Sequence, residues 1–335
     1  MKLRDRVLAA LDYQETDVIP YNLPIEDEVA ARLDAHYGSP AWRQRVQDHI
    51  AVLRLPALGI PEGVPRIYSD PFGSVWRGDR RPAHLERPAL EKPDLSGYAW
   101  PDLDALWDEA HVQQQLQAAQ ARGQFILATT GFGIFERSWT MRGFENAMTD
   151  MLLHPDFYGE LLDGILKFQL QVVERMLALP LDGFLLSDDW GEQRGVIMGP
   201  RLWRKFVKPR AEQLFAAVHA SGKWNFLHCC GSVFDILPDM IEIGLDVLES
   251  LQPEAMDVYE IKRRHGRQLR LWGGLGTQRV IPFGSPAEIR AEIARLRREL
   301  GRGGGYILAP AKPLMPEVPT ANAVAVVEAF TANGV

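Results

Sequence analysis

His228, Cys229 and Cys230 stand side by side, and the two cysteines are the only ones in the 335-residue chain. Adjacent cysteines rarely form a disulfide, because their Cβ atoms cannot easily reach the required geometry. We therefore expect free thiols or metal ligands, as in a reducing compartment. In His228-x-Cys230, an imidazole and a thiolate offer the donors that zinc prefers, and both would point the same way along an extended strand. The alternative interpretation is a buried histidine beside two small apolar thiols.

Charged side chains that follow other apolar segments could complete such a centre. No third cysteine exists, so a third zinc ligand must come from Asp188, Asp189 or Glu249, and we assign Glu249 to the metal. We assign Asp188 and Asp189 to acid–base catalysis, with an anchor for a cationic ligand as an alternative, and we expect one of the two to cap the following helix. Lys312 is the third catalytic candidate, because it could hold a substrate carboxylate as a point charge; otherwise it is a solvated loop lysine.

These residues need a scaffold that brings strand ends together. Short, largely apolar runs predict buried parallel strands at 124–129, 183–187, 223–228, 246–249, 269–272 and 306–309, with 18–22 as a first strand. Amphipathic helices separate them, one of which begins with a capping box at Ser285 and ends before Gly301. No glycine-rich phosphate loop follows an early strand, so we prefer a (β/α)8 barrel of the α/β class to a doubly wound sheet.

The active site of a parallel barrel lies at the C-terminal ends of its strands. Besides the charged residues, the predicted ends supply a set of substrate-binding candidates, which are Asn22, Thr130, Trp190, Gln252 and Trp272. Core packing is the alternative for at least one of the tryptophans.

Residues 23–115 fit the strand–helix repeat poorly, because prolines break the segment between 56 and 93. Residues 66–76 predict a hairpin within it. We interpret 23–115 as an insertion or lid over the barrel mouth and 116–335 as the main barrel repeats, all in one domain spanning 1–335.

Charge and hydropathy exclude two classes of partner. The net charge is −7, and the longest basic run is Lys262 to Arg264, which argues against a nucleic-acid surface. No segment has the roughly 20 apolar residues of a membrane span, and the N-terminus has no signal-peptide core. The expectation is a cytoplasmic monomer or homodimer that acts on a small molecule.

Several segments together resemble the uroporphyrinogen decarboxylase family, which implies a (β/α)8 barrel. They are RVLAAL at 6–11, DVIP at 17–20, GFEN at 143–146, LHCCG at 227–231, GLDVL at 244–248, WGG at 272–274 and GGGYI at 303–307. True uroporphyrinogen decarboxylases carry an arginine-rich motif after the first strand. Here residues 21–28 contain no arginine and three acids, which disfavours a porphyrinogen with many carboxylates.

The resemblance is stronger to the branch of zinc-dependent methyltransferases that exchange methyl groups with a corrinoid protein or a thiol. Their His-x-Cys pair matches His228 and Cys230, and DDWGEQ at 188–193 is similar as well, which adds Gln193 to the substrate-binding candidates. Those enzymes take a further ligand from the loop after the last strand, where this chain has Lys312. A protonated lysine cannot bind zinc, so either a carboxylate completes the site or zinc is absent.

The leading hypothesis is a methyltransferase or demethylase, with zinc, that moves a methyl group between a methoxylated or methylthio substrate and a corrinoid (cobalamin) or thiol acceptor. The first alternative is a decarboxylase of a small carboxylated substrate. The second is a non-catalytic protein that binds a tetrapyrrole or corrinoid, although the polar ring at the strand ends argues against it.

Overall fold

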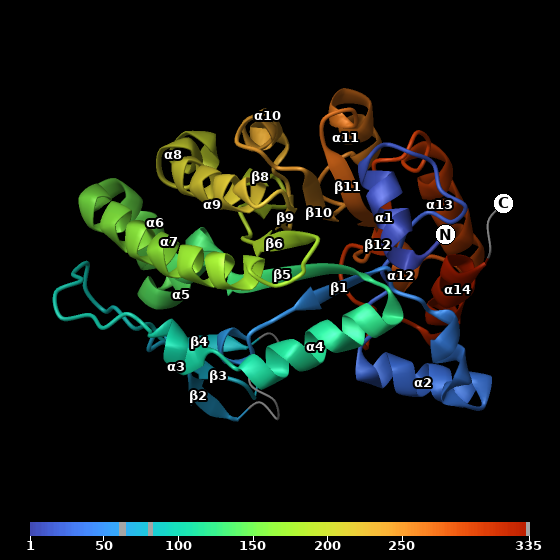
Figure 1. Cartoon of the computed structure of the whole chain (residues 1–335), viewed down its shortest axis with the longest axis horizontal. Coiled ribbons are helices and arrows are strands. Elements are labelled where there is room, and N and C mark those ends of the chain that lie inside the picture. Colours follow the sequence, from blue (N-terminus) through green and yellow to red (C-terminus); the bar gives the residue numbers. More distant parts are fainter. Residues whose placement is uncertain (60–64, 80–82, 333–335) are drawn as a thin grey trace.

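Seven parallel strands form one curled sheet in the order β1-β5-β6-β9-β10-β11-β12 (Figure 1). The computed structural model describes residues 1–59, 65–79 and 83–332. The six strands predicted between residues 124 and 309 all lie in this sheet, so the (β/α)8 barrel is confirmed. The strands are β1 (Ile50–Leu53), β5 (Phe125–Phe132), β6 (Gly183–Ser187), β9 (Trp224–His228), β10 (Val247–Leu251), β11 (Arg270–Leu275) and β12 (Tyr306–Pro310).

The gap between β12 and β1 is closed by residues 20–22, and the prediction of a first strand at 18–22 is wrong in its extent. Tyr21 makes a single parallel bridge to Leu308. On the other side, the Asn22 side chain bonds to both backbone groups of Ile50, at 3.0 Å and 2.9 Å. The Asn22 amide thus continues the seam beyond the backbone bond from the N–H of His49 to the carbonyl of Tyr21, so Asn22 has a structural role in the barrel wall.

Helices cover the outer face of the sheet (Figure 1). Within the described residues, none of the helices has the length and apolar character of a membrane span. The capping box predicted at Ser285 is present at the start of α13. The α-helices are α1 (Leu3–Leu11), α2 (Asp27–Tyr37), α3 (Leu103–Leu106), α4 (Glu109–Arg122), α5 (Ile134–Arg142), α6 (Phe144–Leu153), α7 (Pro155–Leu177), α8 (Gly199–Phe206), α9 (Lys208–Ala220), α10 (Leu237–Glu242), α11 (Val258–His265), α12 (Val280–Phe283), α13 (Pro286–Glu299) and α14 (Thr320–Thr331), with 3-10 turns at Pro40–Arg45, Pro56–Leu58 and Phe234–Ile236.

The inside of the barrel is filled by alternate residues of the strands, including Phe125, Phe226 and Trp272. Helix α1 joins this cluster through Val7 and Leu11. The Arg4 backbone N–H bonds to the carbonyl of Gly123, just before β5, so α1 lies at the N-terminal ends of the strands. The C-terminal ends are therefore the end of the barrel that α1 leaves open.

The prediction that 23–115 forms one insertion is wrong at residues 50–53, because β1 belongs to the barrel sheet. The expected hairpin is present, as β2 (Ile67–Ser69) and β3 (Val75–Arg77), and β4 (His84–Arg87) extends it to three antiparallel strands. Trp76 stacks on Phe132 at the C-terminal end of β5, so this small sheet borders the open end of the barrel. Residues 60–64 and 80–82 of the predicted insertion lie outside the described residues.

Candidate active site

The predicted centre lies where β9 ends. Strand β9 pairs with β6 on one side and β10 on the other, and the registers place His228 level with Ser187 and Glu249. The chain leaves β6 through Asp188 and Asp189. Both aspartates and the segment 228–231 therefore meet at the C-terminal ends of neighbouring strands, where parallel barrels carry their chemistry.

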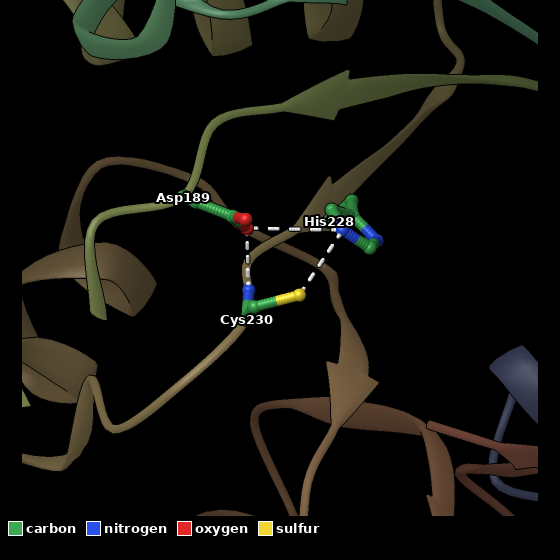
Figure 2. Close-up of side chains that lie close together, drawn as sticks. All are labelled: Asp189, His228 and Cys230. Carbon is green, nitrogen blue, oxygen red and sulfur yellow. Dashed lines mark hydrogen bonds and ion pairs between the residues drawn. The ribbon is translucent and has the colours of Figure 1, made fainter. Parts of the chain in front are cut away.

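Asp189, His228 and Cys230 form one cluster (Figure 2). The Nε2 atom of His228 lies 3.5 Å from Sγ of Cys230 and 3.7 Å from Oδ1 of Asp189. Asp189 also accepts a 2.7 Å hydrogen bond from the backbone N–H of Cys230, which ties the carboxylate to this loop. The side chains of His228 and Asp189 are 29% and 35% exposed, so a ligand can reach them from solvent.

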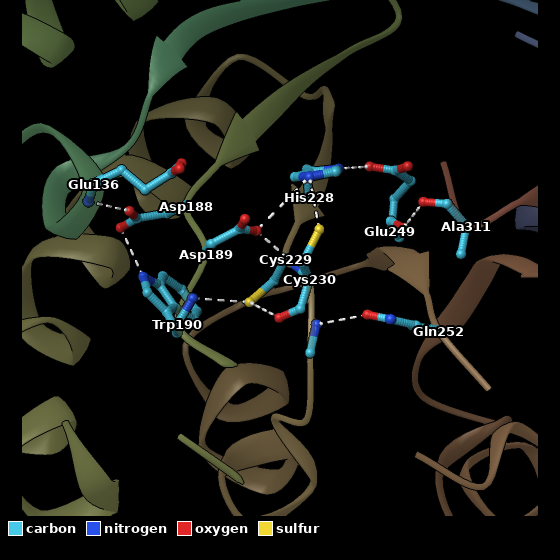
Figure 3. Close-up of polar contacts among 12 residues, drawn as sticks. Glu136, Asp188, Asp189, Trp190, His228, Cys229, Cys230, Glu249, Gln252 and Ala311 are labelled. Carbon is cyan, nitrogen blue, oxygen red and sulfur yellow. Dashed lines mark hydrogen bonds and ion pairs between the residues drawn. The ribbon is translucent and has the colours of Figure 1, made fainter. Parts of the chain in front are cut away.

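The loop that carries Cys230 is held by close backbone contacts. Gly231 has φ +76°, and a Cβ there would lie 2.4 Å from the backbone of Gly191. Only glycine fits both the left-handed conformation and this approach. Gln252, which we predicted to bind substrate, is buried and accepts the N–H of Gly231 instead. Its function in this structure is to position the loop (Figure 3).

The two cysteines lie in different surroundings. Cys229 is fully buried, and its Sγ accepts the backbone N–H of Trp190 at 3.2 Å. Burial raises the pKa of this thiol well above its ordinary value, so it stays protonated. Cys230 is only partly buried and faces His228. Of the pair, Cys230 alone therefore has the position of a metal ligand.

Glu249, the third metal ligand predicted from the sequence, lies on the other edge of the imidazole ring. Its Oε2 is 2.5 Å from Nδ1 of His228 (Figure 3). Among the described residues, the three donor groups close enough to share a metal ion are those of Asp189, His228 and Cys230, so Asp189 takes the position predicted for Glu249. Burial lowers the pKa of His228, but the charge of Glu249 and the contact with Cys230 outweigh it, so the pKa is raised well above its usual value. Glu249 thus fixes a proton on Nδ1 and turns Nε2 toward the cluster.

If the cluster binds zinc as the sequence predicts, replacing Glu249 with glutamine is expected to weaken that binding about 10- to 100-fold, because the ring loses the carboxylate that orients it. Competition with a chromogenic chelator measures the affinity, and Glu192→Gln serves as a control on an exposed glutamate of the adjacent loop. An unchanged zinc affinity in Glu249→Gln would contradict this orienting role.

Asp188 is a structural carboxylate, which corrects its assignment to catalysis. It is 3% exposed and accepts the backbone N–H groups of Phe135 and Glu136, at 3.0 Å and 2.8 Å. It also accepts Nε1–H of Trp190 at 2.6 Å. Asp188 thus caps the first turn of α5, whose entry requires Gly133, since a Cβ there would lie 2.3 Å from that of Asp188. The capped helix precedes β6, whereas the sequence suggested a helix after it.

Glu136 is a buried acid at the site that the sequence analysis missed. It lies in the first turn of α5, is 8% exposed, and points toward Asp189 (Figure 3). Burial first, and then the charges of Asp189 and Asp188, raise its pKa well above the usual range. In sequence it follows the predicted end of β5 by several residues, and only the fold of α5 brings it to the cluster.

The remaining predicted residues are not among the three clustered donor groups. Trp190 is core, packed edge-to-face on Trp203 at 5.2 Å. Trp272 fills the barrel interior against Phe226. Thr130 is buried in β5, where the register with β6 shifts between Thr129 and Phe132. Large aromatic and β-branched residues are favoured there by packing alone. Two further residues are exposed, Gln193 in the β7–β8 turn (Gly191–Glu192 and Gly195–Val196) and Lys312 after β12.

Fold and site together define a (β/α)8-barrel protein whose strand ends carry a histidine, a cysteine and a carboxylate within reach of one another. The sequence model of the uroporphyrinogen decarboxylase (URO-D) family matches residues 103–332, which is more than half of the chain. This protein belongs to that family.

Individual relatives fall in both branches that the sequence analysis distinguished. The chain is 28% identical over 174 residues to the methylcobamide:CoM methyltransferase MtaA of Methanosarcina barkeri, covering 52% of this chain and 48% of that protein. It is 23% identical over 169 residues to the uroporphyrinogen decarboxylase of Neisseria meningitidis, covering 49% and 45%. The chain thus matches about half the length of these relatives. A solved methyltransferase from Methanosarcina mazei shares the fold, with a TM-score of 0.72, 21% identity and 98% of both chains covered.

Proposed function

We propose that this protein is a zinc-assisted methyltransferase, which moves a methyl group between a small methylated substrate and a thiol or a corrinoid carried by a partner protein. The observation that carries the proposal is the cluster of Asp189, His228 and Cys230 at the strand ends. The likeness to a methylcobamide:CoM methyltransferase supports the choice of methyl transfer.

The geometry of the cluster fits zinc. With Zn–S of about 2.3 Å and Zn–N and Zn–O of about 2.1 Å, the donors of a tetrahedral site lie roughly 3.4–3.6 Å apart. The distance from Nε2 of His228 to Cys230, 3.5 Å, falls in that range, and the 3.7 Å to Asp189 exceeds it by about 0.1 Å. A thiolate, a carboxylate and a neutral imidazole also balance the charge of a divalent ion. Three protein ligands leave the fourth position open, as in catalytic zinc sites.

Asp189 is our candidate for the third zinc ligand, which Lys312 cannot supply. The resemblance to the methyltransferases placed a further ligand after the last strand, where this chain has a lysine. Lys312 is exposed, and within residues 1–59, 65–79 and 83–332 no hydrogen bond or ion pair involves it. The carboxylate after β6 is already in position, so we assign the third ligand to Asp189.

Each residue has a distinct part in the proposed reaction. When bound, zinc would favour the anionic form of a substrate thiol or act as a Lewis acid on a methylated substrate. Cys230 and Asp189 would supply the negative charge that holds the metal, and His228 a lone pair at Nε2. Glu249 keeps the Nδ1 proton in place. Asp188 acts only through the loop geometry, by holding Trp190 and α5.

Zinc content and methyl transfer together test the proposal. Protein purified without added metal is expected to carry close to one equivalent of zinc, and chelation should abolish methylation of a thiol by methylcobalamin, followed by the absorbance of the corrinoid. Less than about a tenth of an equivalent, with activity that survives chelation, would overturn the zinc assignment. Release of CO2 from a carboxylated substrate, without methyl transfer, would favour a decarboxylase instead.

A further inference from the structure

Arg54 lies on the same rim as the proposed zinc ligands. It follows β1 directly, so it stands at a C-terminal strand end like His228 and Glu249. Gln115 of α4 fixes its backbone, because the Gln115 side chain accepts the N–H of Arg54 at 3.0 Å and donates to its carbonyl at 2.8 Å. Sequence analysis missed this residue because β1 was assigned to the insertion.

The guanidinium of Arg54 has no direct partner in the described part of the chain, since every hydrogen bond there to this residue goes to its backbone. This distinguishes it from two arginines of α5. Arg137 pairs with Asp70 at 3.0 Å and Arg142 with Asp150 at 2.7 Å, both in buried positions. A guanidinium with its donors unused at a strand end can bind a ligand without first breaking an ion pair.

Ile50 and Val52 of β1 pack inside the barrel, so the alternation of the strand directs Arg54 toward the mouth of the barrel. Nearby protein atoms lower its pKa by burial, and the charge of Glu249 opposes that effect. Yet the residue is exposed to solvent. Both observations hold if the side chain extends over the open end of the barrel, where protein surrounds it and water still reaches it. Glu249 lies on β10, across the mouth from β1, and its carboxylate is already bonded to His228.

We propose that Arg54 binds an anionic group of the substrate, a carboxylate or a sulfonate, and so directs the other end of that molecule to the cluster of Asp189, His228 and Cys230. The planar guanidinium suits such groups, because it can donate two parallel hydrogen bonds to two of their oxygens. This function was expected of Lys312 from the sequence. The inference rests on the proposed function for the identity of the reacting end, and it narrows the substrate to small anionic thiols or their methyl thioethers.

Binding of three matched thiols tests the proposal. Mercaptobutyrate, mercaptopropanesulfonate and the uncharged mercaptopropanol differ only in the terminal group, and calorimetry on zinc-loaded protein gives their affinities. Arg54→Met is expected to weaken binding of one or both anionic thiols about 10- to 100-fold and to leave mercaptopropanol unchanged. Whichever acid loses more affinity identifies the natural group. Arg54→Lys should retain part of the preference, because it keeps the charge without the two-pronged geometry.

Two further variants decide between Arg54 and its rivals. Arg194→Gln removes an arginine whose side chain is 91% exposed and should change nothing. If Lys312→Met removes the preference for anions while Arg54→Met does not, the proposal is wrong. An equal loss for mercaptopropanol in Arg54→Met would also overturn it, since that result indicates a general disturbance of the site.

The same variants separate this inference from the proposed function. Butyrate and propanesulfonate, which have no thiol, are titrated into metal-free protein. An Arg54-dependent affinity there supports the anion site even if zinc or methyl transfer is not found. Methyl transfer that proceeds equally well with Arg54→Met and any of the three thiols would leave the proposed function intact and disprove the role of Arg54.

Discussion

Replacing Cys230 with serine is expected to remove zinc from the proposed site and to abolish the proposed methyl transfer, whereas the same change at Cys229 leaves both nearly intact. Sγ of Cys230 lies 3.5 Å from Nε2 of His228, on the exposed side of the loop. A serine hydroxyl stays protonated near neutral pH and is a poor zinc ligand, so affinity should fall by more than about 100-fold. Metal analysis after dialysis, together with the methylcobalamin assay, measures both effects.

Cys229→Ser is the matched control, because it makes the same atomic change one residue away. The buried Sγ of Cys229 accepts the N–H of Trp190, and a hydroxyl can accept that bond too. We expect a small loss of stability, on the order of 1 kcal/mol, from placing the more polar atom in the core. Zinc retained in Cys230→Ser, or lost only in Cys229→Ser, would exclude the ligand assignment.

Changing Asp188 to asparagine is expected to destabilise the fold, and the same change at Asp189 to weaken zinc binding instead. The two oxygens of Asp188 accept three N–H groups, and an asparagine would turn an N–H₂ toward at least one of these donors. The lost charged hydrogen bond and the unsatisfied donor cost about 2–4 kcal/mol. Burial raises the pKa of Asp188 to about 6, so the comparison belongs near pH 8, where the wild-type carboxylate is ionised.

Urea denaturation of metal-free protein separates the two aspartates. Asp188→Asn should lower the urea midpoint. Asp189→Asn should have a free energy of unfolding within about 0.5 kcal/mol of the parent, because Asp189 is partly exposed. Chelator competition should then show a weaker zinc site in Asp189→Asn, by more than about 10-fold. If Asp189→Asn keeps full zinc affinity, the third ligand must be sought elsewhere, with Glu249 the next candidate.

The strands that the sequence predicted correctly are those with a continuous apolar run between clear helices. This periodicity also placed His228 and Cys230 at the rim, since their position depends only on where β9 ends. Strand β1 has four residues inside a segment rich in prolines, and its neighbour in the sheet, β5, lies more than 70 residues later. Its place in the barrel is set by tertiary pairing, which local pattern does not contain.

For the same reason, the sequence does not show which of Asp188 and Asp189 is structural and which lies in the cluster. Both follow β6, and either could have faced the mouth. The decision rests on α5, whose free N–H groups at Phe135 and Glu136 take up Asp188 over a separation of about 50 residues. Likewise, Glu249 contacts Nδ1 of the His228 ring, whereas Asp189 lies near Nε2. Contacts of this kind depend on the finished fold.

The seam between β12 and β1 sets an order of events for a growing chain. Residues 20–22 are synthesised early, yet their backbone partner is Leu308, almost 290 residues later. During synthesis the ring of strands therefore stays open until Leu308 has left the ribosome. Such distant closure makes folding slow and leaves two strand edges exposed in the meantime. The Asn22 side chain, which bonds to the backbone of Ile50, can join residues 20–22 to β1 before Leu308 is synthesised.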